Sequence, residues 1–394
     1  MSKALIPVLL TVLLDLLGFG IVIPLLAFYA ETFQAGPIAI GLLMACYSLA
    51  QFLFAPIWGA VSDRVGRRPV MLISVGATAL CLAGFASASS LWMLFLFRTL
   101  HGMATANIST AQACVADLTT PENRAKGMGL IGAAFGVGFT VGPFVGGELS
   151  RFGLAFPIWV AAGLSALNFL LALVMLPETR RPDSEQRRRP ISPTAFAQVL
   201  RHPVVGLCVA LTFLSTAAFA LMEGMFNVFA EHTWGLGAME VGRLFGVSGL
   251  ITVIVQGGLI GRLVKRYGEG RLLPVGLGLL AVGIGLLPFA PPVGAMVAVF
   301  AVLSLGQSIA SPSLQSLISR GTRSDEQGFV LGTNQSLSAL ARAVGPASSG
   351  LLYAHIAPSA PFLAAAGLLG AGVLLSLAAV RQHASGAAQA GNGQ

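Results

Sequence analysis

Charged side chains are scarce in this chain of 394 residues. Asp, Glu, Lys and Arg together make up 10% of it, whereas soluble proteins carry roughly 25%. Hydrophobic residues make up 55%, and the mean hydropathy is +0.83. This composition excludes an ordinary soluble domain and predicts an all-α membrane protein. The 48 glycines fit helices that approach one another closely in lipid.

The chain also lacks the patterns that carry enzyme chemistry. Its four cysteines lie inside apolar segments without metal-ligand spacing or a disulfide framework. No Walker A sequence, nucleophile elbow or cluster of metal-ligating residues is present. An enzyme or an ATP-driven pump is therefore not expected, and we expect no cofactor and no metal. The first apolar segment is long, contains Asp15 and lacks a clear cleavage site, so we expect it to remain as helix 1.

Apolar segments long enough to cross a bilayer recur along the whole chain, since a span needs about 20 residues. A break at 87–90 separates helices 3 and 4, and Pro288, Pro291 and Pro292 separate helices 9 and 10. The sequence thus predicts twelve transmembrane helices at roughly 4–30, 38–61, 69–88, 91–117, 126–149, 154–176, 203–229, 238–261, 272–289, 293–318, 327–353 and 360–380.

The basic residues give this layout an orientation. With the N-terminus in the cytoplasm, 19 of the 23 Lys and Arg residues fall in cytoplasmic segments, and Arg151 falls in an outside loop. Lys/Arg-rich short loops stay in the cytoplasm. We therefore expect a multi-pass protein of a bacterial-type inner membrane with both termini cytoplasmic. The same asymmetry explains the net charge of +8 without a nucleic-acid partner.

The longest polar segment divides the chain in two. Residues 177–202 are basic and proline-rich and predict a cytoplasmic linker, with a short amphipathic helix near 193–200. The linker separates a six-helix bundle at 1–176 from a second at 203–383. Residues 384–394 are small and polar, and we expect them to be disordered.

The two halves repeat. Gly59 and Gly66 recur as Gly261 and Gly268 at an offset of 202, and the pair Gly142-Pro143 recurs as Gly345-Pro346 at 203. Two parallel six-helix repeats are typical of secondary transporters, whose substrate site lies between the halves near the midplane. This inference depends on the repeat alone.

The short basic loop in Gly59–Val70, GAVSDRVGRRPV, joins two apolar segments. On charge alone it could be a plain solvated loop, in which Asp63 caps a helix or pairs with an arginine. It also resembles the loop signature between helices 2 and 3 of the major facilitator superfamily, in particular of its drug/proton antiporters, which include the tetracycline exporters. The matching residues are Gly59, Asp63, Arg64, Gly66, Arg67 and Arg68.

Helix 5 carries glycines four residues apart, at Gly138, Gly142 and Gly146, which place bare backbone on one face. Pro143 can bend the helix. A merely close-packed helix would look the same, but the pattern also resembles the antiporter signature of drug/proton exchangers.

Helices 1 and 4 carry the candidate proton-coupling residues. In helix 4, Arg98 and Asp117 resemble a family pattern in which an intramembrane arginine is linked to proton transfer, and His101 precedes a glycine. Asp15 in helix 1 matches an aspartate of the tetracycline exporters. At equal depth, Asp15 and Arg98 are expected to pair as a proton switch, with a structural ion pair as the alternative. Asp117 is expected to pair with Arg64 or Arg67 and so to latch one conformation, together with Asp63 and Arg68.

Further polar residues are assigned to a substrate cavity or to coupling. Glu223 is a second candidate for proton coupling, with simple solvation as the alternative, and Arg342 could pair with it. Each neutral residue could equally join two helices. The cavity candidates are His101, Asn107, Asn227, Gln256, Gln307, Asn334, Gln335 and Arg342.

These observations together predict a monomeric secondary transporter that exports small amphipathic compounds in exchange for protons. The chain lacks the acids that tetracycline exporters carry in helices 3 and 9, which favours the wider drug/proton exporter group. An importer or facilitator of a small metabolite or lipid would share the fold, and so would a sensor or assembly subunit that transports nothing.

Overall fold

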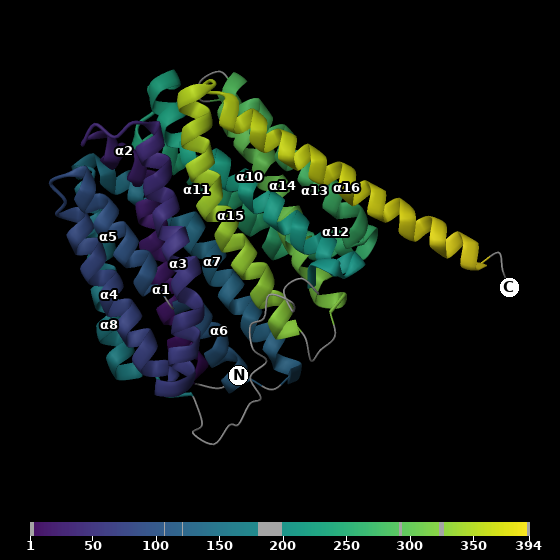
Figure 1. The fold of residues 1–394 in the computed structure, drawn as a ribbon, viewed down its shortest axis with the longest axis horizontal. Coiled ribbons are helices and arrows are strands. Elements are labelled where there is room, and N and C mark those ends of the chain that lie inside the picture. The colour runs from purple at the N-terminus through teal and green to yellow at the C-terminus, as the bar shows by residue number, and fades with distance from the viewer. Residues whose placement is uncertain are drawn as a thin grey trace. The chain divides into compact units, whose positions relative to one another are not determined.

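The structure is a computed structural model, and it describes residues 4–105, 107–119, 121–179, 199–290, 294–322 and 327–391. Within these ranges every regular element is a helix, as the composition predicts (Figure 1). Most of the linker, including residues 193–198 of the predicted amphipathic helix, lies outside the described residues, and 199–201 are helical.

The described residues of the first half form eight α-helices and two short 3₁₀ turns. Pro24, which lacks a backbone N–H, lies in the first of these turns and interrupts the predicted helix 1. The elements are α1 (Leu5–Val22), η1 (Ile23–Leu25), α2 (Leu26–Glu31), α3 (Pro37–Val65), α4 (Arg67–Ala86), α5 (Leu91–Ala104), α6 (Asn107–Leu118), α7 (Pro121–Leu149), η2 (Ser150–Phe152) and α8 (Ala155–Met175).

Among the described residues, the second half begins with a helix of 32 residues, α10, and ends with another of the same length, α16. The predicted helix 8 is interrupted by a π-helical turn. The elements are α10 (Pro203–Trp234), α11 (Ala238–Ile254), the π turn η3 (Val255–Leu259), α12 (Ile260–Tyr267), α13 (Glu269–Leu286), η4 (Leu287–Phe289), α14 (Gly294–Arg320), α15 (Gln327–His355) and α16 (Ala360–Gly391). The segment 384–394, for which we expected disorder, belongs to α16 as far as Gly391, because its alanines favour helix.

Ten helices within the described residues are long and apolar enough to cross a membrane. The remaining two predicted spans coincide with α5–α6 and with α15, whose polar residues lower its hydropathy. The breaks predicted at 87–90 and at the Pro288 cluster are confirmed, since α4 ends at Ala86 and α13 at Leu286. The count of twelve stays a prediction.

The prediction of one continuous helix 4 over 91–117 was wrong. Thr105 leaves the helical conformation, with φ −72° and ψ 97°, and separates α5 from α6. Its backbone N–H and its hydroxyl both donate to the carbonyl of His101, at 3.0 and 2.7 Å, so α5 closes its last turn at this residue. The break places Asn107, a residue that favours helix starts, at the first position of α6.

The chain divides into two compact units. The first comprises Met1–Arg188 and Gly224–Gly249, and the second comprises Arg189–Glu223 and Leu250–Gln394. The units therefore differ from the predicted sequence halves, because the end of α10 and most of α11 belong to the first unit.

The first unit is built on α1, which packs between α7 and α8, while α4 packs on α8 and α3 on α5. Side chains from α1, α4, α6, α7 and α8 form one apolar core that includes Leu5, Val12, Met71 and Ile131. In the second unit α13 packs against α14 and α16. Each unit thus has an interior of its own that can hold polar side chains away from lipid.

Candidate functional site

The loop between α3 and α4 is a one-residue corner at Gly66. This glycine has φ 110° and ψ 161°, a conformation that only glycine adopts readily. The Glu178 carboxylate lies directly beside it and accepts hydrogen bonds from the backbone N–H groups of Arg67 (2.9 Å) and Arg68 (3.2 Å). A Cβ on Gly66 would lie 2.5 Å from Glu178 Oε2. The N-terminus of α4 therefore binds a carboxylate, as helix N-termini favour.

Arg67 is the centre of this corner. Its Nη1 lies 2.8 Å from Asp63 Oδ1 and donates to the hydroxyl of Ser62 at 2.7 Å, and its Nε lies 3.3 Å from Asp117 Oδ2. The guanidinium thus joins the end of α3, the start of α4 and the end of α6. The expected partnership of Asp117 with Arg64 or Arg67 is realised with Arg67.

The other two arginines of the loop differ in their surroundings. Arg68 donates from Nη2 to the carbonyl of Leu173 at 2.7 Å, whereas Arg64 is exposed.

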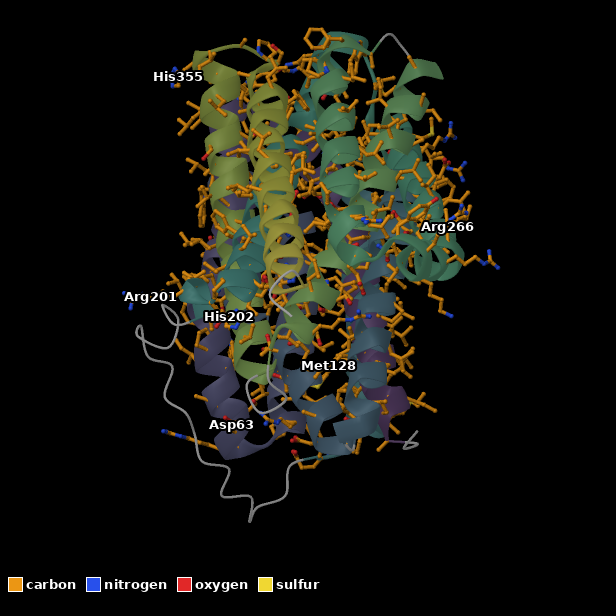
Figure 2. All side chains as sticks on the ribbon, turned by 90° about the vertical axis from the view of Figure 1, so that its right-hand side faces the viewer. Asp63, Met128, Arg201, His202, Arg266 and His355 are labelled. Carbon is orange, nitrogen blue, oxygen red and sulfur yellow. The ribbon has the colours of Figure 1, made fainter. Side chains whose placement is uncertain are left out.

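Figure 2 places Asp63 and Met128 toward the same end of the first unit, called here the Gly66 end. The sequence did not predict the role of Glu178, because it lies 111 residues after Arg67 and no local pattern relates the two. The sequence shows only that Glu178 follows the end of a long apolar segment, in Pro-Glu-Thr.

The glycine face of α7 packs on the backbone of α1. A Cβ on Gly138 would lie 2.9 Å from the Leu16 carbonyl oxygen, and one on Gly142 would lie 2.6 Å from the Gly20 Cα. At Gly146 a Cβ would overlap the carbonyl oxygen of Ile21. The predicted close-packing role of these three glycines is therefore realised on α1.

A second face of α7 packs on α11. A Cβ on Gly147 would lie 2.8 Å from the Gly242 Cα, and one on Gly242 would lie 2.6 Å from the carbonyl oxygen of Pro143. Two turns further along α11, Gly249 lies against the side chain of Thr140. These contacts explain why residues 224–249 belong to the first unit. Pro143 lies inside α7, at the point where the helix is held from both sides.

Asp15 lies in the interior of the first unit, with 9% of its surface exposed. The side-chain amide of Asn107, at the start of α6, is fully buried and lies close to this carboxyl. A carboxyl in such a setting needs either a partner or a proton, because an isolated charge is costly in an apolar interior.

Arg98 packs against Phe19, which lies one helical turn from Asp15 on α1. Its guanidinium carbon is 4.4 Å from the ring centre of Tyr47 and 5.5 Å from that of Phe19, and Phe19 follows Asp15 by four residues on α1. Residues four apart share a helix face, so Arg98 packs on the face of α1 that carries Asp15, one turn away along the helix. His101 packs edge-on against Tyr47, whose hydroxyl lies 3.3 Å from the Thr105 hydroxyl. The ion pair between Asp15 and Arg98 stays a prediction.

The remaining predicted cavity residues lie in varied settings. Asn227, in the first unit, is buried and donates to the carbonyl of Pro24 at 3.1 Å, so it joins α10 to η1. In the second unit Gln256 is exposed within the π turn, a kind of irregularity that is frequent at functional sites. Asn334 is buried and Gln335 exposed on α15, while Glu223, Gln307 and Arg342 are half-buried. Their assignment to a substrate cavity stays a prediction.

Within the described residues no group of three or more His, Cys, Asp or Glu side chains could hold a metal ion. Buried polar groups in an otherwise apolar bundle, two repeats and a broken helix beside a carboxyl together define a multi-pass membrane transporter. The chain belongs to the Major Facilitator Superfamily, whose family profile matches residues 8–346 and, separately, residues 254–393. It is a transporter and not an enzyme.

Comparison with individual proteins narrows the group within this family. The chain is 33% identical over 391 residues to the class C tetracycline resistance protein of Escherichia coli, covering 97% of this chain and 98% of that protein. It is 26% identical to multidrug resistance protein 2 of Bacillus subtilis, over 86% of this chain and 85% of that protein. The crystal structure of the human organic anion transporter MFSD10 (TETRAN) matches with a TM-score of 0.74 and 27% identity, over 95% of this chain and 100% of that one.

Proposed function

We propose that this protein exports small amphipathic compounds, neutral or cationic, in exchange for protons. Its relatives include tetracycline and multidrug resistance proteins, and proton-coupled antiport is typical of this family. The observation that carries the proposal is the burial of Asp15 beside Asn107 in the interior of the first unit. A buried carboxyl can alternate between a charged and a protonated form as its neighbours move.

The proposed proton switch uses the difference between two surroundings of Asp15. An adjacent opposite charge favours the carboxylate, whereas burial without that charge favours the protonated acid. A cationic substrate or a conformational change that separates Arg98 from Asp15 would therefore lead Asp15 to take up a proton. Each unit of pKa difference between two states corresponds to about 1.4 kcal/mol of coupling.

Purified protein in liposomes tests this proposal. An imposed pH gradient should drive the accumulation of tetracycline or of a lipophilic cationic dye, and nigericin, which collapses the gradient, should abolish it. Asp15→Asn should abolish proton-driven accumulation while folding and part of the binding remain, and Arg98→Ala should uncouple transport similarly. Asp15→Glu, which keeps a titratable carboxyl, is the matched control and should retain coupled transport.

Two results would count against this assignment. Accumulation by Asp15→Asn with a normal dependence on external pH would move the proton site elsewhere, with Glu223 the next candidate. Transport that ignores the pH gradient would favour a facilitator or an importer of a metabolite or lipid, and intact protein without any flux would favour a sensor. A binding panel should include organic anions, since tight binding of an anion with no affinity for lipophilic drugs would contradict the proposed substrate class.

We also propose that the Gly66 end of the first unit faces the cytoplasm, with both termini on that side, in a bacterial inner membrane. The loop bias of Lys and Arg supports this orientation. Replacing the four free cysteines and introducing single cysteines at Ser184 and Ser359 tests it in intact cells. Only the Ser359 position should react with an impermeant maleimide. We further propose a single chain as the working unit, which the mass of the purified complex would test.

A further inference from the structure

Asn168 on α8 is hydrogen-bonded to the backbone of α1 in the interior of the first unit. Its side-chain Nδ2 donates to the carbonyl of Thr11 at 3.0 Å, and 1% of the residue is exposed. Within α1 the same carbonyl accepts the backbone N–H of Asp15, because each carbonyl of an α-helix bonds to the residue four positions later. The Asn168 amide therefore holds the backbone of the turn that ends at Asp15.

A second contact between α8 and α1 lies on the other side of Asp15. An added Cβ on Gly18 would lie 3.5 Å from the hydroxyl oxygen of Ser165 and 3.7 Å from the carbonyl oxygen of Ala161. Thr11 lies four residues before Asp15 and Gly18 three residues after it, so the three positions share one side of α1. α8 thus contacts α1 one turn before and one turn after the carboxyl.

Asn168 and Ser165 are unfavourable residues for a contact that serves packing alone. The rest of the buried face of α8 is formed by alanine, proline and isoleucine. Asn168 Oδ1 and Ser165 Oγ are shielded from solvent and have no hydrogen-bond partner among the described residues. Such atoms cost free energy that apolar side chains of similar shape avoid. Polar side chains inside a membrane bundle therefore indicate a functional role.

The two repeats allow the α1 site to be compared with its counterpart on α10. Gly142 of α7 lies against Gly20 of α1, and its counterpart Gly345 of α15 lies against Ala220 of α10. These contacts relate α1 to α10 by an offset of 200 residues. Residues 211 and 215 of α10 therefore take the places of residues 11 and 15 of α1.

The counterpart site has neither the acid nor the amide. Ser215 takes the place of Asp15, and its hydroxyl bonds within its own helix. Leu211 takes the place of Thr11 and faces Gly372 of α16, where an added Cβ would lie 3.4 Å from Leu211 Cδ2. The amide that bonds to the helix backbone thus occurs in the repeat that carries the carboxyl.

Asn168 acts on this site through the backbone and not through charge. α8 contains no ionisable side chain, and η1 and residues 127–147 of α7 contain none either. Arg98 of α5 and Tyr47 of α3 pack with Phe19 of α1, and His101 packs on Tyr47. Asp117 lies at the far end of α6, in the corner at Gly66. The charged surroundings of Asp15 therefore come from helices other than α8.

We propose that Asn168 is a positioning residue of the proton site, which fixes the turn of α1 that carries Asp15 by holding the Thr11 carbonyl. The inference rests on the proposed function in that Asp15 is taken as the proton-binding group. A proton drives a conformational change only as far as its affinity for the two states differs. A turn of α1 that relaxes freely in either state reduces this difference, so coupling falls while the path for substrate stays open.

Infrared difference spectra between acid and alkaline buffer test this positioning without substrate or transport. The C=O stretching band that Asp15→Asn removes belongs to the protonated Asp15, and its position reports the surroundings of the carboxyl. Asn168→Leu and Asn168→Ala remove the donor and should move or broaden this band, whereas Asn168→Gln keeps a donor and should change it less. Phe169→Leu is the matched control on α8, because the Phe169 ring packs on Gly76 of α4, and it should leave the band unchanged.

Transport in liposomes provides the second measurement. Asn168→Leu should lower accumulation driven by an imposed pH gradient at least fivefold, while exchange of substrate without a gradient stays within twofold of the unaltered protein. A merely structural defect would lower both activities together, because it reduces the amount of working protein. Phe169→Leu should therefore keep the ratio of accumulation to exchange.

The outcomes separate the role of Asn168 from the proposed function. An Asp15 band that stays unchanged in Asn168→Leu and Asn168→Ala would contradict a positioning role, even in a protein that exports drugs against a gradient. An equal loss of exchange and accumulation in both variants would also contradict it. A band that moves as expected in a protein without any export would instead contradict the proposed function and leave the positioning of Asp15 intact.

Discussion

The corners at Gly66 and Gly268 hold the same position in the two repeats but carry opposite charges. Arg67 and Glu269 each follow the corner glycine, 202 residues apart, and their partners Asp117 and Arg320 lie 203 residues apart at the ends of α6 and α14. The repeat has thus kept the contact between two helices while the acid and the base have changed places.

The difference lies in which partner is sheltered. In the first unit the arginine is the sheltered side, since 12% of the Arg67 side chain is exposed, and it has two acids and the hydroxyl of Ser62 around it. In the second unit the acid is sheltered, with Glu269 10% and Arg320 70% exposed. The described contacts of Glu269 are Arg320 at 3.0 Å and the Ser316 hydroxyl at 2.9 Å. In the first corner two acids balance one arginine, so losing one acid leaves the other. In the second corner the charge of Glu269 is balanced by one exposed arginine among its described contacts.

The helix crossings repeat in the same manner. The α7 glycine Gly146 lies against the carbonyl oxygen of Ile21, and its counterpart Ser349 on α15 donates a hydrogen bond to the carbonyl of Leu221 at 2.6 Å. The crossing of α7 with α1 leaves no room for a side chain at Gly146. The crossing of α15 with α10 accommodates the small side chain of Ser349, whose hydroxyl is a hydrogen-bond donor. Close approach of backbones is therefore the shared requirement, and it is met by two different means.

The largest difference in stability between the two corners is expected when each corner glycine is replaced by alanine. Both Gly66→Ala and Gly268→Ala strain a backbone conformation that suits only glycine, at about 1–3 kcal/mol each. Gly66→Ala also pushes a methyl group into the Glu178 carboxylate, whereas the space beside Gly268 is open. Thermal unfolding in detergent should give the larger loss of Tm for Gly66→Ala. Equal losses would mean that Glu178 moves aside freely, and Glu178→Ala in the Gly66→Ala background would reveal this.

A smaller contrast is expected from removing the more exposed partner of each ion pair. Arg320→Gln leaves the sheltered Glu269 with a hydroxyl as its described donor, at a cost of about 1–3 kcal/mol, because a sheltered charge loses its counter-charge. Asp117→Asn should cost less, since Arg67 keeps Asp63 at 2.8 Å. Tm values for both variants and for the double charge exchange Glu269→Arg/Arg320→Glu measure the contrast. A greater loss for Asp117→Asn would contradict the idea of a redundant first corner.

The smallest effect is expected at the crossing of α10 and α15. Ser349→Ala removes the hydrogen bond to Leu221 and leaves the packing intact, so the loss should be about 0.6 kcal/mol, as for an average interhelical bond in a membrane protein. Ser349→Val, which adds bulk at the same position, should lower Tm much further. If the two variants behave alike, the hydroxyl rather than the small size of the side chain governs this crossing.

Features that depend on residues close together in the chain were predicted from the sequence. The corner at Gly66, its charged neighbours, the glycine face of α7 and the ends of α4 and α13 follow from residues close together in the chain. The break at Thr105 was not predicted, because no proline or charged residue marks it in the sequence. The role of Glu178 was not predicted either, since it joins segments far apart in the chain that only packing brings together.

The contact of α7 with α11 has a consequence for cutting the chain. A cut at the central linker would divide the chain into two polypeptides. Here the N-terminal fragment would lose the α11 backbone at Gly242 that covers Gly147, and the Asn227 amide that bonds Pro24. A cut at 177–202 therefore severs one packed body, and we expect the fragments to be recovered only when they are co-expressed. A first fragment that keeps all of its packing partners would also have to contain residues 224–249.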